Sequence, residues 1–151
     1  MDKSKVVRAQ GYRWEGVPLR EYKAEGSHFH AITRQTLLGE CEDEQAANFL
    51  TRYFELQPGG YSTLERHRHP HTVVVLRGSG EVILGDRVEA IGLHDCVYIA
   101  PDAFHQFHAS CAEPLGFLCI VDRQRDRPAL PSEEELAQLR RHEHVRRRMR
   151  T

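Results

Sequence analysis

The chain has 151 residues, a length that suits one domain with a buried core. Its 21 Lys and Arg nearly balance its 22 Asp and Glu, which gives a net charge of −1, so no overall field favours nucleic acid or an anionic membrane surface. No stretch approaches the roughly 20 apolar residues that span a bilayer. The first residues, Met1–Lys5, lack the apolar run of a secretory signal. We therefore expect a cytoplasmic protein that binds neither nucleic acid nor membrane.

The first part of the chain predicts an arm followed by strands. Residues 1–26 show no clean periodicity and are expected to form an N-terminal arm. Residues 28–38 and 48–56 alternate as strands do, with an acidic loop between them. The triplet at 58–60 (Pro-Gly-Gly) predicts a turn, and 61–67 is expected to be the next strand.

Further strands are predicted in close succession along the middle of the chain. Gly85-Asp86 is a tight hairpin signal between two of them. The predicted strands cover 71–77, 81–84, 87–91, 96–99, 104–108 and 114–121. Many short strands at such spacing indicate a sandwich or a barrel. The fold class is therefore all-β, an antiparallel β-barrel or jelly roll over residues 27–122.

Residues 123–151 are expected to form a C-terminal tail with a helix from about Ser132. Ser132 is placed as the N-cap and Glu135 completes a capping box. Acidic residues in the first turn and arginines in the last match the helix dipole. The run at 146–150 is a nucleic-acid patch or a solvated helix end, and we favour the solvated end.

The four cysteines, at 41, 96, 111 and 119, form no Cys-x-x-Cys pair, which argues against a thiolate zinc site. Cys96 and Cys119 lie in apolar runs and are expected to be small core residues. A disulfide between Cys111 and Cys119 is conceivable, although it would be unusual in a reducing compartment. None of the four is given a catalytic role.

Histidines supply the main functional signal. His67, His69 and His71 occupy alternate positions, and His105 follows 34 residues after His71. Imidazole is the commonest protein ligand of transition metals, and residues two apart on a strand point to the same face. This pattern predicts a metal site inside the barrel.

Residues 58–108 resemble the cupin family, a small antiparallel β-barrel with a metal at its mouth. The family's first motif is a glycine, five residues, His-x-His, three or four residues, a glutamate, six residues and a glycine. Its second motif is Pro-x-Gly-x-x-His, which ends on the last ligand. Here the second motif matches Ala100 to His105 with Asp102 in the glycine position. Aspartate tolerates the left-handed turn that such a position needs.

The first motif aligns in two ways. Without a gap it runs from Gly59 to Gly78, with Glu65 and His67 in the histidine positions and His71 in the glutamate position. His67 and His71 then converge across a turn at 68–70, and Glu65 is the third member of the cluster.

A shifted alignment instead makes His67 and His69 the His-x-His pair and leaves His71 little room to double back. A strand rises about 3.3 Å per residue, so residues 65 and 71 of a straight strand would lie roughly 20 Å apart. The alternate side chains can share one ion only if the chain turns. The expected ligands are His67 and His105, common to both alignments, then His71, His69 and Glu65 in that order.

The resemblance implies one divalent transition metal, with Fe, Cu, Ni, Zn or Mn as candidates, because a His-dominated set suits these ions. It also implies a metal-dependent enzyme acting on a small organic molecule: a dioxygenase or other oxidoreductase, an isomerase, or a lyase such as a decarboxylase. The alternative is a non-catalytic cupin that binds a metal or a small ligand. A homodimer is expected, with contacts through the arm around Trp14 and the strand 28–38.

Several other residues remain open as site candidates. Either Arg52 or Tyr53 is expected to orient an anionic substrate, but strand alternation alone does not select one. His28-Phe29-His30 is a second His-x-His, expected on a polar strand face, with the cavity or an adjoining subunit as the minor alternative. His108 is weighed as a support for the site and Tyr98 as a proton donor, and in both cases a structural role is favoured.

Overall fold

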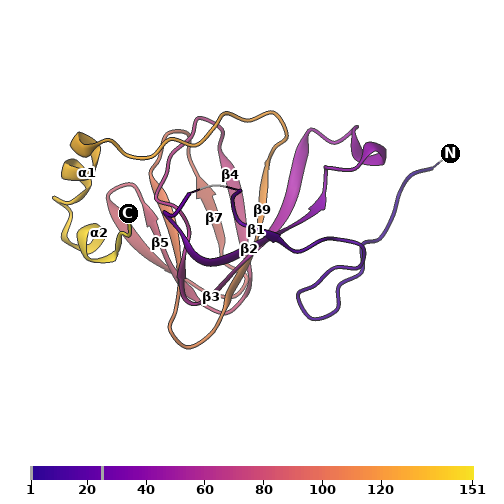
Figure 1. The fold of residues 1–151 in the computed structure, drawn as a ribbon, viewed down its shortest axis with the longest axis horizontal. Coiled ribbons are helices and arrows are strands. Elements are labelled where there is room, and N and C mark those ends of the chain that lie inside the picture. Colours follow the sequence, from indigo (N-terminus) through magenta and orange to yellow (C-terminus); the bar gives the residue numbers. More distant parts are fainter. Residues whose placement is uncertain (1, 25) are drawn as a thin grey trace.

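The computed structural model describes residues 2–24 and 26–151. Mostly antiparallel strands curl into an open half-barrel, with the C-terminal helices on one flank and the N-terminal segment extending from the other (Figure 1). The strands are β1 (Arg20–Glu21), β2 (His30–Leu38), β3 (Phe49–Tyr61), β4 (His71–Arg77), β5 (Gly80–Leu84), β6 (Arg87–Ile91), β7 (Cys96–Ile99), β8 (His105–Ala109) and β9 (Leu115–Asp122). The helices are the 3-10 turn η1 (Glu42–Glu44), α1 (Glu133–Leu139) and α2 (Glu143–Arg148). The predicted all-β class is confirmed.

One long strand, β3, connects the parts of the sheet. The main path runs β6-β5-β8-β3-β9-β4-β7, and β2 and β1 branch from β3. β3 pairs with β2 and β9 along its length and meets β8 at Tyr61. This order places β8 and β4, which begin with His105 and His71, on separate parts of one curved surface.

The predicted turn at 58–60 is wrong, and so is most of the strand predicted at 61–67. β3 continues through this segment to Tyr61. Gly59 adopts φ 77°, and a Cβ on Gly60 would stand 2.8 Å from the carbonyl oxygen of His30. The two glycines let the strand bend against β2 without ending. Between Tyr61 and the start of β4 at His71, the only β-pairing is through isolated bridges at residues 65 and 66.

The main core lies inside the curl of the sheet. β4 alternates, so that Val73 and Val75 are fully buried against β9. Cys119 is also buried, as predicted, but Cys96 is exposed. Burial alternates along β7, with Val97 and Ile99 inward and Cys96 outward. A short strand can expose a small apolar residue on its outer face, so the apolar run did not reveal the orientation of Cys96.

A second, smaller core lies under the C-terminal helices. Ser132 and Glu135 form the predicted capping box at the start of α1. The single predicted helix is two short ones, separated by a turn at 140–142. The core side chains are Leu64, Ile83, Leu136, Leu139 and Val145. None of the described helices combines the length and apolar character needed for a membrane crossing.

Candidate metal centre

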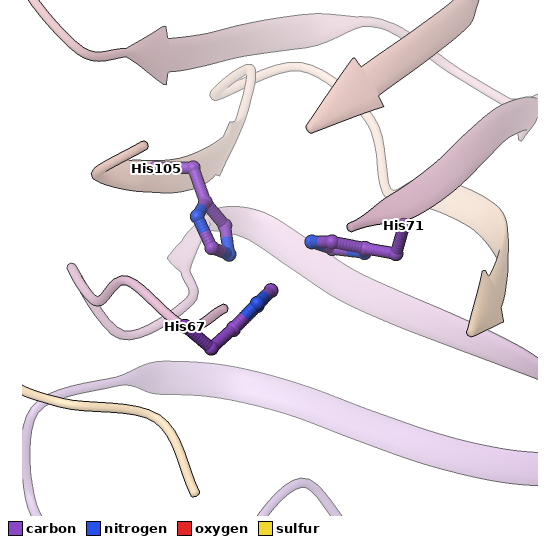
Figure 2. Close-up of side chains that lie close together, drawn as sticks. All are labelled: His67, His71 and His105. Carbon is purple, nitrogen blue, oxygen red and sulfur yellow. The ribbon is translucent and has the colours of Figure 1, made fainter. Parts of the chain in front are cut away.

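Three histidines from three stretches of chain meet at one point. His67 lies in the segment after β3, His71 opens β4 and His105 opens β8. Their candidate ligand atoms all lie within 4.8 Å of one another. Figure 2 shows the three rings gathered around a common space, each from its own segment. Such a spacing suits three ligands of one ion.

Backbone hydrogen bonds fix His67 beside His105. The two residues 65 and 105 form an antiparallel bridge: Glu65 donates to the His105 carbonyl at 3.2 Å, and His105 donates to the Glu65 carbonyl at 3.0 Å. The Asp102 N–H donates to the His67 carbonyl at 2.8 Å. Asp102 has φ 62°, the left-handed conformation expected of this position in the second motif.

Asp126 holds the turn that brings His71 back toward His67. Its carboxylate accepts hydrogen bonds from the Arg68 N–H at 2.9 Å, the His69 N–H at 3.0 Å and the His69 ring at 2.8 Å. These bonds keep the pKa of Asp126 far below its usual range, the backbone bond from Arg68 foremost. The chain therefore reverses at 68–70, as the gapless alignment expects.

His69 and Glu65 are engaged elsewhere. The His69 ring stacks on His67 with centroids 3.7 Å apart and an interplanar angle of 4°, and its Nδ1 bonds Asp126. The buried Glu65 carboxylate forms an ion pair with Lys23. Neither belongs to the group of mutually close ligand atoms. Metal ligation by either one remains a prediction, behind the three clustered histidines.

The second ring nitrogen of each clustered histidine already has a partner. Nδ1 of His67 lies 2.6 Å from the His69 carbonyl and Nδ1 of His105 lies 2.9 Å from the Ala103 carbonyl. A carbonyl only accepts, so both rings carry the proton on Nδ1 and keep the lone pair on Nε2. Nδ1 of His71 contacts the Cys119 Sγ at 3.1 Å.

Nε2 of His71 is buried and has no hydrogen-bond partner among the described residues. A buried polar atom without a partner is costly unless a missing group satisfies it. Partners fixed on Nδ1 are also the usual way in which proteins orient metal-binding imidazoles. The donor set thus fits a transition metal held by the Nε2 atoms of His67, His71 and His105.

Burial keeps these rings uncharged. Burial is the main cause that lowers the pKa of His105 to about 3, and burial together with repulsion from His105 and His67 lowers the pKa of His71 to about 2. The pKa of His67 is also lowered, again mainly by burial. Neutral imidazoles present free lone pairs, as metal binding requires.

The cluster opens into a cavity of about 970 Å³. Arg52 lines this cavity, whereas Tyr53 points to the other face of β3, where it bonds Glu55 at 2.7 Å and packs on Trp14. The pleat of β3 thus turns Arg52, and not Tyr53, toward the cavity, and a role for Arg52 in orienting an anionic substrate stays a prediction. His28 also lines the cavity, which agrees with the minor alternative for this second His-x-His.

Three further cavity residues, Cys119, Arg34 and Arg125, were missed in the sequence. Arg34 follows Ile32 on β2 and Cys119 follows Phe117 on β9, each at the alternate position that shares a face. This alternation is visible in the sequence, but it identifies cavity residues only when the side of each strand that faces the cavity is known.

His108 and Tyr98 lie away from the cluster. Tyr98 is 64% exposed on the outer face of β7. His108 is buried on the outer face of β8, where its Nε2 bonds Gln106 at 2.8 Å. Gln106 in turn bonds the carbonyls of Ser62 and Arg150. The C-terminus covers this face of β8, so His108 and Gln106 serve packing.

Comparison with known proteins agrees with this geometry. The family model described as the Cupin domain matches residues 52–121. A protein of Rhodospirillum rubrum named 1-methylthio-D-xylulose 5-phosphate methylsulfurylase is 49% identical over 133 residues, which are 85% of this chain and 81% of that protein.

Solved structures give the same result. A cupin 2 conserved barrel domain protein from Rhodopseudomonas palustris is 39% identical, with a TM-score of 0.88 over 98% of this chain and 100% of that one. A cupin 2 domain-containing protein from Halorhodospira halophila is 51% identical, with a TM-score of 0.77 over 100% of this chain and 99% of that one.

Proposed function

This chain belongs to the cupin family, and from that premise we propose that it is a metal-dependent enzyme that cleaves the carbon–sulfur bond of a phosphorylated 1-methylthio ketose. The observation that carries the proposal is the cluster of three neutral histidines in a cavity that also holds a buried thiol and several arginines. The substrate class comes from the name of the 49% identical relative. It favours thiol-dependent cleavage of a carbon–sulfur bond over the oxygen-dependent cleavage and the lyase chemistry that the resemblance implies.

The metal would be held by His67, His71 and His105. The candidates remain the divalent ions of Fe, Cu, Ni, Zn and Mn, all of which accept imidazole nitrogen. When bound, the ion supplies a Lewis acid that draws electron density from the ketone oxygen of the substrate. The chain's own task is to keep the three Nε2 lone pairs free and aimed at one point, which the Nδ1 partners do.

Cys119 is the group placed to accept the methylthio sulfur. Its Sγ lies 3.1 Å from Nδ1 of His71, and Arg52 donates to it at 3.4 Å. Burial raises the pKa of the Cys119 thiol, while the positive charge of Arg52 acts in the opposite direction. Burial outweighs Arg52, so the group rests as a thiol, and the nucleophile for sulfur is the thiolate that forms when it gives up its proton between these two donors.

The proposed reaction is a thiol–sulfide exchange, in which each bond that forms is matched by one that breaks. The Cys119 thiolate attacks the methylthio sulfur and forms a methyl disulfide, while the bond between carbon 1 and sulfur breaks. The electron pair stays on carbon 1 as an enolate, which takes a proton to give a 1-deoxy ketose phosphate. The carbon is reduced and the two sulfurs are oxidised. A low-molecular-weight thiol then exchanges with the disulfide and restores Cys119.

The direct test is turnover of 1-methylthio-D-xylulose 5-phosphate by the metal-loaded protein with a small thiol present. Proton NMR should show the new methyl group of the 1-deoxy product. Metal bound in stoichiometric amount, with no product from this substrate, would contradict the proposal. It would instead favour the alternative of a non-catalytic cupin that binds a metal or small ligand.

Three broader expectations stay proposals beside this one. We propose a cytosolic homodimer with an N-terminal arm at 1–26, a barrel at 27–122 and a tail at 123–151. The four free cysteines support a reducing compartment. Val6 and Leu19 of the arm are exposed apolar residues that suit a dimer contact. Sedimentation showing a 17.4 kDa species at micromolar concentration would contradict the dimer.

A further inference from the structure

The cavity around the histidine cluster carries a marked excess of positive charge. Among the lining residues that the structure describes, Glu65 is the one carboxylate, and Lys23 already neutralises it. The remaining charged side chains of the lining are all cations: Arg34, Arg52, Arg125 and Arg127. A concave site with one sign of charge concentrates ligands of the opposite sign.

None of these four arginines forms an ion pair with a carboxylate in the part of the chain that the structure describes, and three of them, Arg34, Arg52 and Arg125, adjoin one another. Arg52 donates to the Cys119 Sγ and lies 5.0 Å from the centre of the Phe54 ring. Arg125 donates only to the Arg123 carbonyl, at 3.4 Å. The Nε atoms of Arg34 and Arg52 are buried without a hydrogen-bond partner. Arg34 and Arg52 are half-buried, and Arg125 is the most exposed of the three. A buried guanidinium nitrogen normally has an acceptor against it.

The sheet register brings the three side chains to one wall. Arg52 on β3 pairs with Cys119 on β9 and with Thr36 on β2. Arg34, two residues before Thr36, therefore lies diagonally across from Arg52 on the same cavity face. Arg125 follows the end of β9. Through Cys119, this wall adjoins His71 of the metal cluster.

These charges repel one another in the absence of an anion. Burial is the main cause that lowers the pKa of Arg34 and of Arg125, and the charge of Arg52 lowers both further. Glu40 opposes this for Arg34, but its carboxylate is 4.0 Å from Arg20. An anion bound among the three guanidinium groups would relieve the repulsion.

We infer that Arg34, Arg52 and Arg125 form an anion subsite that holds the phosphate group of the substrate beside the metal cluster. The inference rests on the proposed function for the identity of the substrate, and on the arginines themselves for the site. Phosphate fits better than carboxylate because it carries about two charges and three acceptor oxygens at neutral pH. Planar guanidinium groups bind such oxygens in pairs.

The test measures binding of inorganic phosphate to the metal-free protein by calorimetry, with acetate as the carboxylate arm. The variants are Arg34→Gln, Arg125→Gln and the pair together, with Arg146→Gln on the exposed face of α2 as the matched control. We expect the double variant to bind phosphate at least about tenfold more weakly, and Arg146→Gln to match the wild type. Affinity should fall with added salt.

Equal phosphate affinity in the double variant and the wild type would overturn the inference. So would absent binding by the wild type, or acetate bound as tightly as phosphate. Circular dichroism checks that each variant folds. Arg34→Lys, which keeps the charge, replaces any variant that does not fold. Arg34→Lys should bind phosphate more weakly than the wild type but more tightly than the double variant.

Activity measurements separate this inference from the proposed function. Turnover of the methylthio ketose phosphate with an unchanged KM in the double variant would sink the subsite and leave the function standing. Phosphate binding that depends on the arginines, without any turnover of the methylthio ketose phosphate, would leave the subsite standing and sink the function. A comparison of D-xylulose with D-xylulose 5-phosphate then shows whether the phosphate group itself is recognised.

Discussion

Nδ1 of His71 lies 3.1 Å from Sγ of Cys119, so the same contact orients a metal ligand and holds the thiol at the metal cluster. The two residues lie diagonally across the neighbouring strands β4 and β9, since His71 pairs with Val121 and Cys119 pairs with Val73. Cys119 also accepts from Arg52 at 3.4 Å. The histidine cluster, the thiol and the proposed anion subsite are thus connected through one sulfur atom.

Replacing Cys119 separates its proposed chemical role from its packing role. Cys119→Ser keeps an acceptor for the His71 ring, so we expect metal content close to that of the wild type, whereas Cys119→Ala removes this partner of His71 and should bind the metal more weakly. Turnover of the methylthio ketose phosphate should fall on the order of 10³-fold or more, because the sulfur acceptor is gone. Full activity of Cys119→Ala would show that an external thiol attacks the substrate directly.

Asp126 should affect metal binding although it is not in the cluster. Its carboxylate holds the turn at 68–70 through three hydrogen bonds, so Asp126→Asn is expected to loosen the relation between His67 and His71. Removing such an outer partner typically weakens metal affinity by about 10- to 100-fold. Competition with a chromophoric chelator measures the change. Asp122→Asn, at the exposed end of β9, is the control, and equal affinities in both variants would refute the role.

The metal-free protein should lose stability in mild acid. Burial lowers the pKa of His108 from 6.5 to about 3, so the unfolded chain binds more protons than the folded one between these values. The contribution of His108 is complete above pH 6.5 and declines as pH falls toward 3. At pH 5 the loss is about 2 kcal/mol from this group.

Urea unfolding at pH 7.5 and pH 5 tests this sign. His108→Gln should lose about 2 kcal/mol less than the wild type between the two pH values. The same direction holds for His71 and His105 in the metal-free protein, so some acid sensitivity should remain in the variant. Identical losses in both proteins would show that His108 does not titrate on unfolding.

Gln106 is expected to hold the C-terminus on the barrel. It donates to the Ser62 and Arg150 carbonyls and accepts from the Arg150 N–H at 2.9 Å. Gln106→Leu leaves these buried partners unsatisfied, at a cost of about 2–4 kcal/mol of unfolding free energy. Trypsin should then cut the Arg146–Arg148 segment faster, as followed by mass spectrometry. Unchanged cleavage would mean that the helical core alone retains the tail.

Much of the fold was predictable because its signals are local. Period-2 alternation and tight turns located β4 through β9, and the Ser132–Glu135 capping box located the start of α1. The path of β3 through 58–60 was not predictable, since the glycines permit either a turn or a bent strand. Pairing with β2, a distant contact, decides between the two.

The sequence predicted that histidines form the candidate site, but it did not predict which of the neighbouring candidates lie together. Local spacing left His69 and Glu65 as ligand candidates beside His67 and His71. In the structure His69 bonds Asp126 and Glu65 pairs with Lys23, and both partners lie far away in the sequence. Cys119 and the cavity arginines likewise acquire meaning only when three strands are assembled around the cluster.

Metal content of protein purified without added metal or a polyhistidine tag tests the central claim most directly. Elemental analysis should find about one transition metal ion per chain in the wild type and in His28→Ala, a cavity histidine outside the cluster. His67→Ala, His71→Ala and His105→Ala, each checked for folding by circular dichroism, should lose most of it. Retention of the full metal content by all three of these variants would contradict a metal centre at this cluster.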